Sequence, residues 1–431
     1  MVVVTRNFHL AKLIPSLSHT SRHFSVKSTY HPGDQVTVGG RQYPSDHMTN
    51  ITPHILSHMG RNLHLQQYHP LCHISDRIVK YMYGRYLTPR GSPLFSVHSQ
   101  LHPVVTTQQN FDSLLIPKDH VSRKKSDNFY VNKEQLLRAH TSAHQCELMR
   151  MGLDNFLVIG DVYRRDEIDS SHYPVFHQVE GVRLLTKSDV YGKQQDMKEY
   201  ELFTPEGPPT HHPHVINILK ADLKDCLQGL ATTLFGRDVE MRWVDAYFPF
   251  THPSWELEVK LNDQWIEMLG CGIIQHQVLL NADVEERVGW AFGLGLERWA
   301  MKLYQIPDIR VFWSTDPGFL SQFVFDDPAT NVNFKVVSKH TPCINDISFW
   351  LPSDSSYEAA DFYDIVRSIG GNLVEQVYLV DQFTHPHTGR TSHCYRIVYR
   401  HMDRILTQEE VNRVHSRIEQ ETTTALGVTV R

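Results

Sequence analysis

Residues 156–312 constrain the fold most, because apolar runs with strand-like composition recur there between polar loops. We expect these runs to build one large sheet, preceded by a mostly helical region. The spacing of apolar residues predicts helices over 54–59 and 70–83, and a further helix is expected near 134–151. Residues 191–214 are acidic and then rich in proline and histidine, which indicates a surface insertion.

One strand of this region carries a row of polar and aromatic side chains. Phe176, Gln178 and Glu180 share a face, because side chains alternate along a strand. Such a row suits a pocket wall, in which the amide and carboxylate hold an ammonium group and the ring stacks on a flat ligand. The alternative is a hairpin whose charged turn, around Arg164, is simply solvated.

Two further strands carry side chains that suit a ligand. Phe248 and Phe250 alternate onto one side and could form a slot for another aromatic ring, although core packing is the commoner role of such a pair. Glu267 stands apart from its apolar neighbours, and a carboxylate in a buried strand needs a partner such as phosphate-bound Mg²⁺. The alternative is an edge strand with Glu267 in water.

A glycine-rich segment at 289–298 runs from a strand into a helix. It is not a dinucleotide fingerprint, because Arg298 stands where the third glycine would be, and no Gly-Lys-Ser/Thr follows as in a phosphate-binding P-loop. Its glycines permit close approach to a flat ligand. Arg298, on the first helical turn, suits a terminal phosphate through its planar guanidinium.

Residues 339–431 read as a separate unit. Strand, helix, strand, strand, helix and strand follow in order, and Thr407 with Glu410 predicts a capping box at the second helix. This βαββαβ order is the ferredoxin-like arrangement.

Charge and cysteine usage limit the possible partners. The net charge is −6, so contacts to nucleic acid have to come from a local basic patch. Arg390, Arg396, Arg400 and Arg404 cluster in the last unit, and the interpretation is a phosphate-contact stripe or an ordinary solvated strand face. The six cysteines lie far apart without a Cys-x-x-Cys pair, which argues against disulfides and structural zinc.

The N-terminus differs from the rest of the chain. No acidic residue precedes Asp34, a gap with a chance of roughly 2 % at the chain-wide acidic frequency. The segment is rich in serine and threonine and contains four lysines or arginines, whose removal would take the net charge from −6 to −10. These features predict a mitochondrial transit peptide, and the alternative is a disordered basic tail.

Together these segments resemble motifs of the class II aminoacyl-tRNA synthetases. GDVYRRDEID at 160–169 with FHQVEG at 176–181 resembles motif 2, and GLGLER at 293–298 resembles motif 3. TSAHQ at 141–145, FPFTHPS at 248–254 and IEMLGCG at 266–272 resemble phenylalanine-specific members. The basic leader and the fused ferredoxin-like unit are similar to the mitochondrial, single-chain branch. HVSR at 120–123 departs from the His-Pro-Ala-Arg of relatives.

The resemblance implies an α+β fold, with an antiparallel class II sheet flanked by helices and a C-terminal ferredoxin-like domain. It implies a monomeric phenylalanine–tRNA ligase of the mitochondrial matrix that uses ATP with Mg²⁺ and no membrane. Arg164, Arg298 and Glu267 would be catalytic, with Glu267 also near the metal. Substrates would be bound by Ser142, Ala143, His144, Gln145, Arg164, Ser171, His172, Tyr173, Phe176, Gln178, Val179, Glu180, Phe248, Phe250, Glu267, Phe292 and Arg298. Contacts to tRNA(Phe) would come from Arg390, Arg396, Arg400 and Arg404.

The expected division of the chain is a leader over 1–33, a catalytic domain over 34–320, a linker over 321–338 and an anticodon-binding domain over 339–431. Two other interpretations stay open. A class II synthetase for another amino acid is disfavoured by the apolar Phe248–Phe250 pair. A non-catalytic tRNA-binding paralogue is disfavoured because the proposed catalytic arginines and glutamate are all present.

Overall fold

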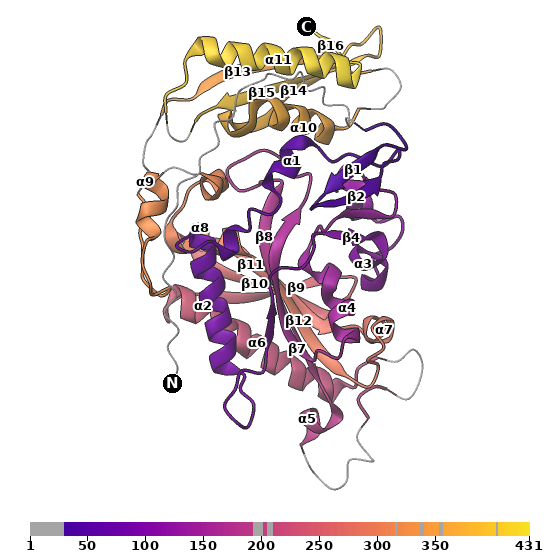
Figure 1. The fold of residues 1–431 in the computed structure, drawn as a ribbon, viewed down its shortest axis with the longest axis vertical. Helices are drawn as coiled ribbons and strands as arrows, with labels where there is room; N and C mark the ends of the chain where they lie inside the picture. The colour runs from indigo at the N-terminus through magenta and orange to yellow at the C-terminus, as the bar shows by residue number, and fades with distance from the viewer. Residues whose placement is uncertain are drawn as a thin grey trace.

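A computed structural model of the 431-residue chain describes residues 30–192, 201–204, 210–314, 317–335, 340–352, 357–401 and 404–431. It has a large body and a smaller C-terminal body stacked along the long axis of the molecule (Figure 1). Most of the expected leader, residues 1–29, lies outside the described residues, as do 193–200 and 205–209 of the expected insertion. No helix in the described part is long and apolar enough to cross a bilayer. All six cysteines are free thiols.

A seven-stranded sheet forms the centre of the large body. Its strands run in the order β3 (Ser96–His98), β7 (Asn155–Tyr163), β8 (Val175–Leu185), β12 (Val288–Gly295), β11 (Gln264–Ile274), β10 (Thr251–Leu261) and β9 (Met241–Phe248). β3 pairs in parallel with β7, and every other neighbouring pair is antiparallel. The sheet expected over 156–312 is therefore present and mostly antiparallel.

Helices cover both faces of this sheet. α2 (Pro70–Arg85), α6 (Pro213–Phe235) and α8 (Leu296–Tyr304) pack on one face, and α4 (Gln145–Arg150) and α7 (His276–Asn281) pack on the other. α6 was not expected in a region read as strands, although Val215, Leu219, Leu223 and Leu227 of its buried face recur every four residues.

The prediction of a helix near 134–151 is wrong for the first half of that segment. The segment begins with β6 (Gln135–Leu137), which pairs with β4 (Val104–Thr106) and β5 (Tyr130–Asn132) in a small sheet. A 3₁₀ turn, η4 (Thr141–His144), follows, and only α4 is α-helical. Strand pairing with residues distant in sequence overrides the local helical pattern here.

The C-terminal body has the expected ferredoxin-like order. It comprises β13 (Cys343–Trp350), α10 (Ala359–Gly370), β14 (Val374–Thr384), β15 (Thr391–Tyr399), α11 (Gln408–Leu426) and β16 (Thr429–Val430), and its sheet runs β14-β15-β13-β16. Both helices pack on one face of this sheet. Thr407 caps α11 by accepting from the Glu410 N–H at 3.2 Å. The reciprocal half of the expected box is absent, because the Glu410 carboxylate binds Arg404 instead.

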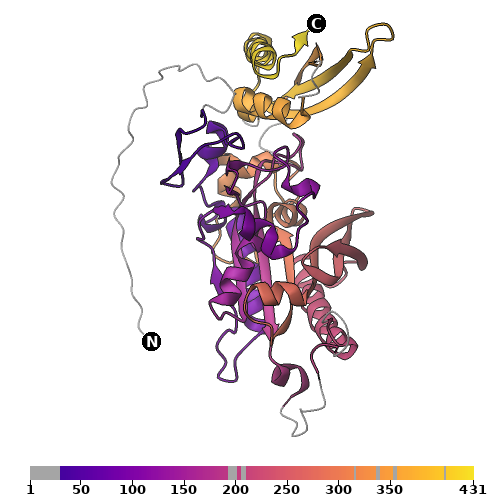
Figure 2. The ribbon, with the colours of Figure 1, turned by 90° about the vertical axis from the view of Figure 1, so that its right-hand side faces the viewer.

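The two bodies meet at α10, which faces the large body in Figure 2. Arg165, which follows β7, is buried there between Asp361 and Asp364, with its Nη2 2.6 Å from Asp361 Oδ1 and its Nε 2.8 Å from Asp364 Oδ2. Burial alone would lower the pKa of Arg165, but these two carboxylates raise it. The segment expected as a linker is not free of the large body, since Phe323 is fully buried in its core and Phe334 packs against it.

Candidate active site

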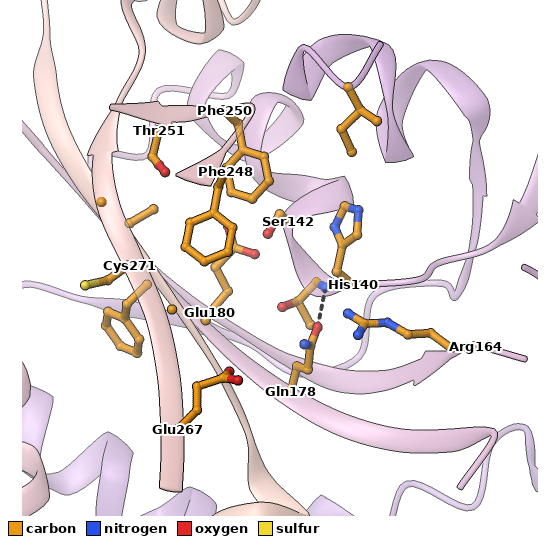
Figure 3. Close-up of a pocket in the computed structure, with 17 residues that line it drawn as sticks. His140, Ser142, Arg164, Gln178, Glu180, Phe248, Phe250, Thr251, Glu267 and Cys271 are labelled. Carbon is orange, nitrogen blue, oxygen red and sulfur yellow. Dashed lines mark hydrogen bonds between the residues drawn. The ribbon is translucent and has the colours of Figure 1, made fainter. Parts of the chain in front are cut away.

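Two adjoining cavities open on the sheet face that carries Gln178 and Glu180. The first has a volume of about 330 Å³ and is lined among others by His140, Ser142, Glu180, Phe248 and Phe250 (Figure 3). The second has a volume of about 250 Å³ and is lined among others by Ser171, His172, Tyr173, Phe176 and Arg298. Both are bordered by Arg164, Gln178, Glu267 and Gly293, so these residues lie at the junction of the two cavities.

The first cavity is an apolar slot over a floor of small residues. The Phe248 and Phe250 rings lie with their centroids 6.0 Å apart and their planes 21° apart. Phe248 lies over Gly270, where an added Cβ would stand 2.7 Å from its Cζ. At Gly293, a Cβ would meet nothing within 4 Å, because the space above it is the cavity. The slot therefore accepts a flat apolar group through edge and face contacts.

A buried carboxylate stands at the inner wall of this slot. Glu180 is 2 % exposed, and burial raises its pKa to about 7, with partial compensation from the hydroxyls of Ser142 and Thr141. Neither of its oxygens has a hydrogen-bond partner of good geometry among the described residues. A ligand ammonium group would supply the missing charge and donors.

The 3₁₀ turn η4 provides the polar rim of the slot. The Thr141 N–H donates to Gln178 Oε1 at 3.3 Å, which ties the turn to β8. His140 lines the cavity beside Arg164, and sequence reasoning missed it. Burial, with the nearby Arg164 charge, lowers the pKa of His140 to about 3 against an opposing contribution from the Asn110 backbone, and neither ring nitrogen has a hydrogen-bond partner of good geometry among the described residues. His140 is therefore a neutral group able to bind a ligand.

Arg164 is fixed at the junction of the two cavities. Its Nε donates to the Ala139 carbonyl at 2.8 Å, and its guanidinium lies 5.2 Å from the centre of the Phe176 ring. Burial lowers the pKa of Arg164, and the charge of Arg298 adds to this effect. A half-buried cation that faces both cavities is suited to a charge that forms between their ligands.

Arg298 and Glu267 form an ion pair at the wall of the second cavity. Arg298 Nη1 lies 3.2 Å from Glu267 Oε1 and donates to the Glu267 carbonyl at 3.1 Å, and both side chains are half-exposed. The loop between β7 and β8 contributes Ser171 and His172, whose backbone N–H groups both donate to Asp169. Tyr173 also borders the cavity, but its hydroxyl is hydrogen-bonded to His58 Nε2 at 2.9 Å.

Five of the expected residues direct their side chains into the protein and not into either cavity. Ala143, His144, Gln145 and Val179 border neither cavity and are buried. His144 Nε2 is 3.0 Å from Arg138 Nη1 and is held inside the protein. Phe292 borders the first cavity, but its ring packs over Gly181 beside Trp290 in the core. These side chains support the site from behind.

Three arginines of the expected basic stripe are bound to acids from other elements. Arg396 makes two 2.7 Å hydrogen bonds to Asp346 of β13, Arg400 Nε lies 3.1 Å from Glu375 of β14, and Arg404 Nη1 is 2.8 Å from Glu410 of α11. The stripe was inferred from the few acidic residues close to these arginines in the sequence. One of those acids, Asp403, lies outside the described residues. Exposed ion pairs of this kind are weak, so these arginines can still exchange their acidic partners for a phosphate.

An aromatic group lies on the face of the C-terminal sheet opposite its helices. Trp350 packs between two guanidinium groups, with Arg390 Cζ 5.2 Å and Arg431 Cζ 4.9 Å from its ring. The Phe383 ring is 6.3 Å and the His385 ring 6.4 Å from Trp350. We call these five residues the aromatic patch. Rings and cations on an exposed sheet are typical of surfaces that bind unpaired bases.

The comparisons with known proteins agree with this architecture. The family model of the tRNA synthetases class II core domain (F) matches residues 59–194 and 216–323, and that of the ferredoxin-fold anticodon binding domain matches 338–431. The fold and site thus define a class II aminoacyl-tRNA synthetase core joined to an anticodon-binding domain.

Relatives narrow the class further. The chain is 53 % identical to the mouse phenylalanine–tRNA ligase, mitochondrial, over 92 % of this chain and 89 % of that protein. It is 51 % identical to the probable mitochondrial enzyme of Drosophila melanogaster, over 92 % of each, and 40 % identical to that of Saccharomyces cerevisiae, over 89 % of this chain and 92 % of that protein. The chain belongs to the family of mitochondrial phenylalanine–tRNA ligases. Among solved structures, a pyrrolysyl-tRNA synthetase from Desulfitobacterium hafniense matches with a TM-score of 0.40 and 15 % identity over 59 % of this chain and 77 % of that chain.

Proposed function

We propose that this chain activates phenylalanine with ATP and transfers the phenylalanyl group to mitochondrial tRNA(Phe). The observation that carries the proposal is the junction of the two cavities at Arg164, Gln178 and Glu267. An apolar slot with a buried carboxylate suits phenylalanine, and a polar cavity with an arginine at its far wall suits ATP. Their ligands would meet where Arg164 stands.

The geometry supports a simple division of work in the first step. The phenylalanine carboxylate is itself the nucleophile, so its attack on the α-phosphate needs no protein base. Glu180 and Gln178 would hold the ammonium group, and Phe248 and Phe250 would hold the ring. Arg164 would stabilise the charge that builds up at the α-phosphate, which leaves positioning and electrostatics as the main contributions.

The second cavity would hold the nucleotide. Phe176 offers a ring face for the adenine, and the Arg298 guanidinium is placed to bind a phosphate and to cover the base. Arg298 forms an ion pair with Glu267 in this structure. When ATP binds, a phosphate would replace Glu267 as the partner of Arg298. Ser171 and His172, in the exposed loop above this cavity, would contact ATP and the 3′ end of the tRNA.

The carboxylates near Glu267 fit a magnesium ion. Burial, followed by the charges of Glu267 and Glu258, raises the pKa of Glu256, so these carboxylates lie close enough to repel one another. Within the described residues no three His, Cys, Asp or Glu side chains form a ready metal site. Two carboxylates, Glu267 and Glu256, would hold Mg²⁺ only together with the ATP phosphates, a typical arrangement for this ion. The ion would neutralise phosphate charge.

The aromatic patch is our revised proposal for the main anticodon contact. Trp350 and Phe383 would stack on unpaired bases, while Arg390 and Arg431 supply charge. Arg396, Arg400 and Arg404 would add phosphate contacts at lower strength, because each has an acidic partner. We keep the remaining proposals from the sequence: a monomer of the mitochondrial matrix, a leader over 1–33 and the catalytic and anticodon-binding domains over 34–320 and 339–431. Residues of 321–338 that pack on the large body would belong to it.

Exchange of labelled pyrophosphate into ATP with each of the standard amino acids tests the activity. Phenylalanine should support exchange far better than any other amino acid, and charging should be seen only with tRNA(Phe). Stronger exchange with another amino acid would assign the site to that substrate. No exchange by a folded protein that still binds tRNA would favour the non-catalytic alternative.

A further inference from the structure

Two buried side chains join β8 to the helix that carries Arg298. His177 on β8 is fully buried, and Glu297 in the first turn of α8 is 2 % exposed. Glu297 Oε1 lies 2.7 Å from His177 Nδ1, and Glu297 Oε2 accepts from the His177 backbone N–H at 2.8 Å. Both oxygens of one carboxylate are thus bound to a single residue of another element.

This contact stands where the ladder between β8 and β12 ends. The last paired residues are Gln178 and Gly295, after which the chain turns into α8 at Leu296. His177 lies one residue beyond that pair, and Glu297 offers its N–H an acceptor in place of a strand carbonyl. A buried N–H without an acceptor would be costly, so the carboxylate fixes how the helix begins relative to the strand.

The bonded residues are sequence neighbours of two residues at the second cavity. Phe176 precedes His177 and Arg298 follows Glu297, and both Phe176 and Arg298 line that cavity. Because side chains alternate along β8, His177 points away from the cavity and Phe176 points toward it. The hydrogen bond between His177 and Glu297 therefore sets the distance between Phe176 and Arg298 at the walls of this cavity.

The surroundings of His177 hold its ring in one orientation. The His64 ring lies 5.2 Å and the Trp313 ring 5.9 Å from it, the latter nearly parallel at 29°. Its Nε2 has no hydrogen-bond partner among the described residues. Nδ1 carries the proton, since the atom facing it is a carboxylate oxygen.

We propose that Glu297 and His177 are positioning residues whose hydrogen bond holds Arg298 at a fixed distance from Phe176 across the nucleotide cavity. The inference rests on the proposed function, because it assigns that cavity to ATP. His177 does not border this cavity, and Glu297 borders it with both carboxylate oxygens already bound to His177. Their effect on the reaction is transmitted through the placement of Arg298, to which catalysis is sensitive at the scale of an ångström.

A matched pair of variants at one position tests the inference by pyrophosphate exchange. His177→Asn places an amide nitrogen near the position of Nδ1 and keeps a donor for Glu297, whereas His177→Gln places it near Nε2 and loses that donor. His177→Asn should behave nearly as the wild type. His177→Gln should raise the KM for ATP about tenfold or more, as expected for the loss of a charge-assisted bond, with an unchanged KM for phenylalanine.

Glu297→Gln provides the second arm, because it keeps the shape and removes the charge. It should also raise the KM for ATP, and combining it with His177→Gln should add little, since both weaken the same contact. An unchanged KM for ATP in folded Glu297→Gln overturns the inference even if both His177 variants fail to fold. Equal defects in His177→Asn and His177→Gln, or a loss of melting temperature alone, overturn it as well. Absence of exchange in the wild type would instead overturn the proposed function.

Discussion

Replacing Glu180 with glutamine should stabilise the free protein at alkaline pH while weakening its hold on phenylalanine. Burial raises the pKa of Glu180 from its ordinary 4.5 to about 7. A pKa difference of one unit corresponds to about 1.36 kcal/mol, so the ionised Glu180 destabilises the folded state by about 3 kcal/mol. The folded pKa is the higher one, so the penalty is absent below pH 4.5 and complete above pH 7.

Unfolding in urea at several pH values measures how much the ionised Glu180 destabilises the folded state. Between pH 5 and pH 8 the free energy of unfolding of the variant should gain up to about 3 kcal/mol relative to the wild type. Comparing the two pH values cancels the pH-independent cost of burying the glutamine amide. Glu134→Gln, which neutralises an exposed carboxylate of the same body, is the control and should show no such trend.

Exchange kinetics measure the other half of the prediction. The phenylalanine ammonium requires the carboxylate form, so the wild-type KM for phenylalanine should rise as pH falls below 7. In Glu180→Gln it should be roughly ten to a hundred times higher at pH 8 and nearly flat with pH. Parallel stability curves for the two proteins, or a variant with wild-type KM, would refute the assignment of Glu180 as the buried partner of the ammonium group.

Four further outcomes are expected. Arg298→Ala should slow pyrophosphate exchange by about a hundredfold, and wild-type exchange in the folded variant would contradict a phosphate contact. Trp350→Ala should raise the KM for tRNA more than the joint change of Arg396 and Arg400 to alanine does, and neither variant should alter the KM for ATP. A larger effect of the double arginine change would make the arginine stripe the main contact. Deleting residues 339–431 should abolish charging but leave exchange in the folded fraction, and charging at the full rate would contradict the domain roles. The first 34 residues should carry a fused reporter into mitochondria, and a cytosolic reporter would contradict the leader.

Much of the fold was predictable because the signals were local. Alternation along 176–180 placed Phe176, Gln178 and Glu180 on one face, and the structure puts all three at the cavities. The strand and helix order of the C-terminal unit could also be read from periodicity, since each element is an uninterrupted run ended by glycine or a turn.

The errors arose where distant residues decide the structure. His144 was expected at the site because TSAHQ at 141–145 resembles phenylalanine-specific members. The extended backbone of His140 instead places His140, two residues before Ser142, at the same cavity. Alternation around His140 was the signal that could have found it. Likewise, the acids that bind Arg396 and Arg400 come from neighbouring strands, and no inspection of nearby sequence reveals such partners.

Two glycines at the floor of the first cavity should behave differently under mutation. At Gly270 a side chain would collide with Phe248, so a variant there should reduce both the amount of folded protein and its activity. At Gly293 the backbone is not in the left-handed region and an added Cβ meets only open space. A variant there should accumulate normally and yet be inactive, because the side chain occupies the volume that both ligands share. Cellular abundance and enzymatic competence would therefore diverge at Gly293, and a variant there would be missed by any screen that scores protein levels alone.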